Sequence, residues 1–135
     1  MNKQITDKLI EKISDVCRQE EAIVAVYLFG SFASEKMRPG SDIDIGLLLE
    51  PGKEDAFLLL ELAASLERAC DCPVDLVLLN HAGEVLKYRV RRNGYLIFER
   101  DPGMRKQFEV LGRKLFEDFL YLHKRYIRSV LYKNS

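Results

Sequence analysis

The sequence contains no long hydrophobic run, and this absence excludes a membrane-spanning helix. A helix that crosses a bilayer needs about 20 predominantly apolar residues, and no apolar run in the 135 residues approaches that length. Residues 1–15 alternate charged and apolar side chains, so they lack the apolar core of a signal peptide. We therefore expect a cytoplasmic protein with no membrane contact.

Cysteine and histidine are also scarce, and their positions exclude a disulfide scaffold and a zinc site. The three cysteines, Cys17, Cys70 and Cys72, are odd in number and have no framework spacing. No second Cys or His cluster accompanies Cys70 and Cys72 to complete a zinc site. His81 and His123 have no neighbours at ligand spacing. We expect reduced thiols and no structural metal held by sulfur.

The net charge is zero, but the two signs are unevenly placed. Residues 1–80 carry 8 Lys/Arg against 15 Asp/Glu, a balance of −7, and residues 81–135 carry 13 against 6, a balance of +7. The basic half could face a triphosphate, an acidic partner or nucleic acid, or form a solvated surface. Lys87, Arg89, Arg91 and Arg92 are the basic side chains that could neutralise a triphosphate.

Apolar spacing predicts alternating helices and strands, which indicates an α/β (α+β) domain with one small mixed sheet. The length fits a single domain, 1–135, with a core over 1–100. The expected helices cover 2–20, 54–70, 81–92 and 104–132, with one helical turn at 32–36. The expected strands cover 22–29, 41–49, 73–79 and 95–99.

The C-terminal helix is too long for a domain of this size. Over 104–132 it would measure roughly 40 Å, against a width of ~30 Å for a small domain. We expect it either to bend or to pack on something other than its own domain. Its basic end, with interleaved tyrosines, could meet RNA or protein, and its apolar stripe favours a protein partner. We therefore assign 103–133 as a partner-binding helix and expect no direct binding of nucleic acid.

The strongest chemical signal is the stretch from Gly30 to Asp44. Asp42 and Asp44 are two apart at the start of a predicted strand, so they share one face. Carboxylate oxygens are the ligands that Mg²⁺ prefers, with waters and substrate phosphates as the others. Gly30 and Ser31 end the preceding strand, where glycine lets the backbone approach a phosphate and the Ser31 hydroxyl can donate to it.

Asp75 is the candidate third carboxylate. It lies within an apolar strand, where an unpaired charge would be costly. If that strand lies beside the Asp42–Asp44 strand, three carboxylates converge and two Mg²⁺ ions could support an in-line displacement at phosphorus. The alternative is a strand-start residue paired with Arg89 or Arg91.

Gly30-Ser31, the ten-residue gap and Asp42-Ile43-Asp44 resemble the signature of the DNA polymerase β-like nucleotidyltransferase superfamily. The small size, Ser41 before the pair, the Asp75 strand and the long last helix resemble minimal nucleotidyltransferase (MNT) antitoxins that pair with HEPN-domain toxins. The resemblance covers nearly the whole chain.

The resemblance implies a role for each matching position. Asp42 and Asp44 would hold both Mg²⁺ ions, and Asp75 would hold one ion and help activate the attacking hydroxyl. Gly30, Ser31 and Ser41 would bind the nucleotide. For the toxin-paired branch it implies ATP as donor and a tyrosine of the HEPN toxin, typically an RNase, as acceptor, so that adenylylation silences the toxin.

The sequence departs from the family at one place and leaves two alternatives open. Many minimal members continue Gly-Ser with Ala-Arg-Gly, but Ser34 and Glu35 stand here in place of Arg and Gly. The loss of that Arg would weaken a phosphate contact and affect rate more than reaction type. The alternatives are transfer to a small hydroxylated molecule, and a non-catalytic antitoxin that acts by binding and occlusion.

Overall fold

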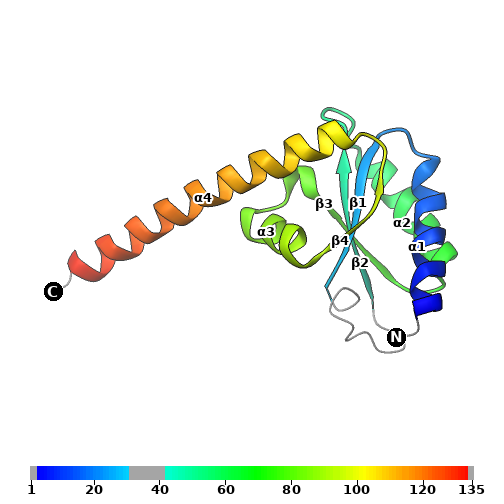
Figure 1. The fold of residues 1–135 in the computed structure, drawn as a ribbon, viewed down its shortest axis with the longest axis horizontal. Helices are drawn as coiled ribbons and strands as arrows, with labels where there is room; N and C mark the ends of the chain where they lie inside the picture. Colours follow the sequence, from blue (N-terminus) through cyan, green and yellow to red (C-terminus); the bar gives the residue numbers. More distant parts are fainter. Residues whose placement is uncertain (1–2, 31–41, 134–135) are drawn as a thin grey trace.

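A four-stranded sheet with helices on both faces forms the body of the protein, and one long helix extends away from it (Figure 1). This computed structural model describes residues 3–30 and 42–133. The elements in chain order are α1 (Lys3–Arg18), β1 (Ile23–Phe29), β2 (Ile43–Leu49), α2 (Ala56–Cys70), β3 (Val74–Leu78), η1 (Leu79–His81), α3 (Glu84–Asn93), β4 (Tyr95–Glu99) and α4 (Pro102–Lys133).

The sheet is mixed, as the sequence predicts, with the strand order β3-β2-β1-β4. Strand β1 pairs antiparallel with both β2 and β4, whereas β2 pairs parallel with β3. The two central strands are nearly all apolar and are buried along almost their whole length. Their continuous apolar runs follow from this position, because both of their faces are covered.

Each face of the sheet has its own apolar core. Ile13 and Cys17 of α1 and Leu66 of α2 are fully buried against one face. Val90 of α3, together with the start of α4, packs on the other face. Burial raises the pKa of the Cys17 thiol to about 12, which fits the expected reduced, unreactive thiol.

Most predicted elements are confirmed, with boundaries shifted by a few residues. The turn predicted at 32–36 lies outside the described residues. Helix α4 is a single helix of 32 residues, about 48 Å long at 1.5 Å per residue. It leaves the body beyond α3 and extends past its own domain (Figure 1). That its outer part packs on another molecule stays a prediction. Within the described part of the chain, no helix is long and apolar enough to cross a membrane.

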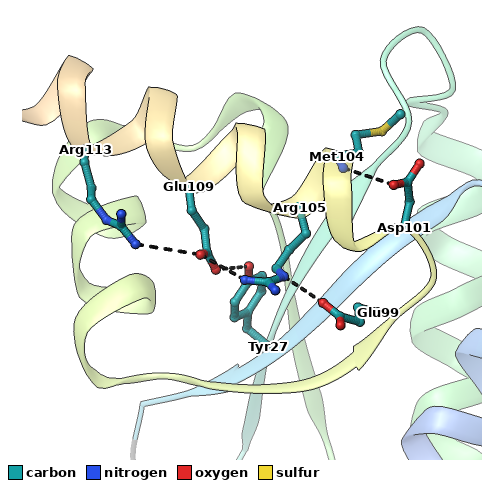
Figure 2. A network of polar contacts seen from close by, with 7 residues as sticks. All are labelled: Tyr27, Glu99, Asp101, Met104, Arg105, Glu109 and Arg113. Atoms are coloured by element: carbon teal, nitrogen blue, oxygen red, sulfur yellow. Dashed lines mark hydrogen bonds and ion pairs between the residues drawn. The ribbon is translucent and has the colours of Figure 1, made fainter.

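The root of α4 is fixed to the sheet by a polar network (Figure 2). The buried Tyr27 hydroxyl donates to Glu109 Oε1 at 2.8 Å. Arg105 donates to Glu99 at 2.7 Å and to Glu109 at 3.0 Å. Asp101 caps the helix by accepting from the Met104 N–H at 3.0 Å. These contacts set the direction in which α4 leaves the sheet.

We expect Glu109→Ala to lower the free energy of unfolding by about 1–3 kcal/mol, because the buried Tyr27 hydroxyl loses its acceptor. Arg113→Ala is the matched control, since Arg113 is exposed and lies 3.9 Å from the same carboxylate; its cost should stay below about 1 kcal/mol. Urea unfolding monitored by circular dichroism measures both. Equal costs for the two variants would contradict this assignment of the network.

Candidate functional site

The pairing register of the strands brings the predicted site residues to one end of the sheet, where β1 ends and β2, β3 and β4 begin. Asp44 of β2 lies opposite Asp75 of β3 in the parallel pair. On its other side, Asp44 lies opposite Phe29, the residue before Gly30. Strand β4 begins at the same edge, where Tyr95 pairs with Leu28 of β1. This end of the sheet therefore carries, in spatial order, Asp75, Asp44, Gly30 and the start of β4.

Asp44 and Asp75 form a close carboxylate pair. Burial is the main cause that raises the pKa of Asp44, followed by the negative charges of Asp75 and Asp42 and a side-chain hydrogen bond with Asp75. Two carboxylates in contact repel each other unless a proton or a cation lies between them. The sequence-based prediction that β3 lies beside the Asp42–Asp44 strand is thus confirmed.

Asp75 and Asp42 differ from expectation, the first in its burial and the second in lying outside the strand expected over 41–49. Asp75 is exposed, because β3 is an edge strand of the sheet, so its charge has no high cost of burial. Asp42 is also exposed and lies just before β2. Among the ion pairs of the described residues, none joins Asp75 to Arg89 or Arg91, so that alternative for Asp75 finds no support.

Gly30 lies against the carboxylate of Asp44. Its φ is +73°, in the left-handed region that favours glycine. A Cβ atom at this position would lie 2.0 Å from Oδ2 of Asp44, so no other residue fits without moving the carboxylate. Glycine is required here for two independent reasons, its backbone conformation and its contact with Asp44.

A cavity of about 610 Å³ opens beside Gly30. Its walls come from the end of β1, from α3 and from the start of β4, and include Phe29, Gly30, Leu86, Arg89, Arg92 and Tyr95. The sequence identified Arg89 and Arg92 only as members of a basic run. It did not connect them with Gly30, because 59 and 62 positions separate them along the chain. The signal available was the unusual density of arginine in α3.

The nucleotide-binding candidates Ser31 and Ser41 lie outside the described residues, as do Ser34 and Glu35. Asp42, Asp44, Asp75 and Gly30 are described. The carboxylate oxygens of the three aspartates are of the type that a hard divalent cation takes as ligands. Across 3–30 and 42–133, no three potential ligand side chains are close enough to form a complete metal cluster. The carboxylate oxygens fit Mg²⁺. Among the described residues, Asp44 and Asp75 are in contact, and Asp42 is not close enough to both to complete a set of three ligands.

A four-stranded mixed sheet with flanking helices and a long last helix is the fold of a nucleotidyltransferase. The family profile described as "Polymerase beta, Nucleotidyltransferase" matches residues 11–103. The chain belongs to this family. A comparison with curated proteins gives no match.

Several solved structures are similar over most of the chain. One is a toxin–antitoxin complex with AMP-PNP, at 28% identity and a TM-score of 0.76, covering 90% of this chain and 98% of the other. Another is a tri-AMPylated HEPN toxin of Shewanella oneidensis in complex with an MNT antitoxin, at 27% identity and a TM-score of 0.71, covering 91% and 96%. A third is an MntA–HepT toxin–antitoxin complex, at 27% identity and a TM-score of 0.70, covering 91% and 97%.

Gly30→Ala should separate activity from stability. The flexible Asp44 side chain can turn away from the new methyl group, so the fold loses only about 1–2 kcal/mol for a left-handed alanine. The displaced carboxylate should lower the rate of nucleotidyl transfer about 100-fold. Labelling with a radioactive nucleoside triphosphate measures the rate, and thermal unfolding measures the stability.

Gly52→Ala is the matched control for this experiment. Its φ is +84°, and a Cβ atom there would meet nothing within 4 Å. It should show the same loss of stability with full activity. A Gly30→Ala protein that transfers as fast as Gly52→Ala would show that the glycine–carboxylate contact has no role in the reaction.

Proposed function

We propose that this chain is an Mg²⁺-dependent nucleotidyltransferase antitoxin that transfers AMP from ATP to a tyrosine hydroxyl of a HEPN-domain toxin and so neutralises it. The observation that carries the proposal is the alignment of Asp75, Asp44 and Gly30 at one sheet edge. The similarity to MNT antitoxins in complexes with HEPN toxins supports the choice of partner, and the AMP-PNP and AMPylated complexes support ATP as donor.

The proposed reaction is an in-line displacement at the α-phosphorus of ATP. The tyrosine oxygen forms a bond to this phosphorus, the bond from phosphorus to the bridging oxygen breaks, and pyrophosphate leaves. The hydroxyl proton passes to the carboxylate of Asp75 and then to solvent. The products are the tyrosyl-AMP ester on the partner and free pyrophosphate.

Each acidic residue has a separate task in this proposal. Asp42 and Asp44 would hold two Mg²⁺ ions together with phosphate oxygens and waters, and Asp75 would bind one of them. Bound Mg²⁺ would neutralise the charge that develops on the phosphates. The raised pKa of Asp44 supports this assignment, since a cation placed between repelling carboxylates favours their charged form. Gly30, Ser31 and Ser41 would bind the nucleotide. The use of ATP as donor agrees with a cytoplasmic location of the protein.

The outer part of α4 is the proposed surface for the partner. Its exposed apolar side chains include Leu115, Phe119, Leu122, Tyr126 and Ile127. Leu115, Phe119, Leu122 and Tyr126 follow one another at steps of three and four, so they share one face of the helix. A contiguous apolar face of this kind marks an interaction site. We assign 103–133 to binding of the HEPN toxin, in keeping with the complexes formed by the similar antitoxins.

Substitution of the acidic pair tests catalysis. Intact mass spectrometry of the co-purified partner should show whole added AMP units with the wild-type chain. Asp42→Asn and Asp44→Asn should each lower this modification about 100-fold or more, because the phosphate charge loses its stabilisation. Asp118→Asn, far along α4, is the control and should modify the partner fully.

The same experiment decides between catalysis and occlusion. In occlusion, the antitoxin would neutralise the toxin by binding alone, through the exposed apolar face of α4. Full neutralisation of the toxin by Asp42→Asn or Asp44→Asn, with an unmodified partner, would favour a non-catalytic antitoxin. A partner that stays modified with both variants would contradict the assignment of these aspartates.

Substitution on α4 tests the binding surface. Leu122→Gln combined with Tyr126→Gln should lower affinity for the partner at least about tenfold, because two exposed apolar side chains lose their burial in the complex. The control combines Arg125→Gln with Arg128→Gln, which removes charge from another face of the same helix. Calorimetry measures both. A larger loss in the arginine pair would identify the basic face as the contact.

A further inference from the structure

The cavity beside Gly30 lies on the opposite side of Asp44 from Asp75. The strand order β3-β2-β1-β4 places Asp75 on the outer strand at one side and the start of β4 at the other. Neighbouring strands lie about 4.8 Å apart, so the span from β3 to β4 is roughly 15 Å. Gly30 belongs to both regions, because it contacts Asp44 and also lines the cavity.

Two arginines provide the charge of this cavity. Arg89 and Arg92 both line it and are exposed. Other basic side chains on the same side of the protein, Lys87 and Arg105, form ion pairs with glutamates. For Arg89 and Arg92, no ion pair is found among the residues that the structure describes. These two guanidinium groups are available to an anion.

The end of α3 is held tightly at this position. A Cβ atom at Gly94 would lie 2.5 Å from the Val90 carbonyl oxygen and 3.0 Å from that of Leu28. Glycine therefore lets the chain turn from α3 into β4 directly against β1. This close approach brings the last turn of α3, with Arg92, next to Gly30.

The direction of the reaction then gives the cavity a role. An in-line displacement needs the nucleophile and the leaving group on opposite sides of phosphorus. With the hydroxyl on the Asp75 side and the α-phosphorus at Asp44, the leaving group points across Gly30. We infer that the cavity receives the two outer phosphates of the nucleotide and then the released pyrophosphate, with Arg89 and Arg92 as their binding residues. This inference rests on the proposed function.

The local electrostatics make the arginines necessary for this role. The C-terminal end of a helix carries a partial negative charge, and the cavity lies beside the C-terminal end of α3. Pyrophosphate would be repelled there without cations. Arginine binds phosphate through paired hydrogen bonds, so Arg89 and Arg92, which lie in the last two turns of α3 and line the cavity, reverse the sign of this region.

The test measures binding of pyrophosphate with Mg²⁺ to the full-length chain in complex with its partner, by calorimetry. Arg89→Gln and Arg92→Gln should each weaken pyrophosphate binding about tenfold, and the double variant should weaken it further. Binding of AMP should change less than about twofold. Pyrophosphate should also become a weaker product inhibitor of transfer. Arg91→Gln is the control, because Arg91 lies against Gly112 of α4 and not in this cavity.

The outcomes separate this inference from the proposed function. Arginine-dependent pyrophosphate binding supports the inference even if no AMP reaches the partner, a failure that would overturn the proposed function alone. Unchanged pyrophosphate binding in the double variant would overturn the inference. Weaker AMP binding with unchanged pyrophosphate binding would also overturn it and would assign the cavity to the nucleobase, with Phe29 and Tyr95 as its aromatic walls.

Discussion

Parallel pairing of β2 with β3 places Asp44 directly beside Asp75, and the geometry of the site depends on this register. Antiparallel pairing of β2 with β1 then places Gly30 against the same carboxylate. A slip of one residue in either pair would turn Asp44 to the opposite face of the sheet. The apolar side chains of the central strands fill the cores on both faces of the sheet, so a slip would disrupt their packing. The cores on the two faces of the sheet therefore keep the acidic pair in place.

The two ends of the molecule have different physical roles. The end of the sheet with the carboxylates concentrates negative charge that a cation can neutralise. Burial, and then the charges of Asp75 and Asp42, raise the pKa of Asp44 there. The other end is α4, whose root is fixed to Tyr27 and Glu99 while its outer turns leave apolar side chains exposed. The proposed catalytic site and the proposed partner-binding surface thus lie on separate elements joined by β1 and β4. Such a separation would let partner recognition vary without disturbing the carboxylates.

Much of the fold follows from local pattern. The positions of the helices and strands, the mixed sheet and the long last helix are all legible from apolar spacing and from the turn residues between elements. Asp75 lies beside Asp44 as predicted, but it is exposed on an edge strand and not buried as its apolar neighbours in the sequence indicate. Spacing cannot tell an edge strand from a central one when both are apolar, because strand order is a property of the whole sheet.

The sequence by itself determined the chemistry of the candidate site: a glycine after an apolar strand, an Asp-x-Asp pair separated from Ser31 by ten residues, and a third aspartate in a later strand. These are local facts, set by residue type and spacing. Only the tertiary structure decided that Asp44 touches Asp75, that Gly30 has no room for a Cβ atom, and that Arg89 and Arg92 line a cavity beside them. The physical reason is that contacts between residues dozens of positions apart are fixed by strand order and helix packing. These depend on the burial of the whole core and not on any single segment.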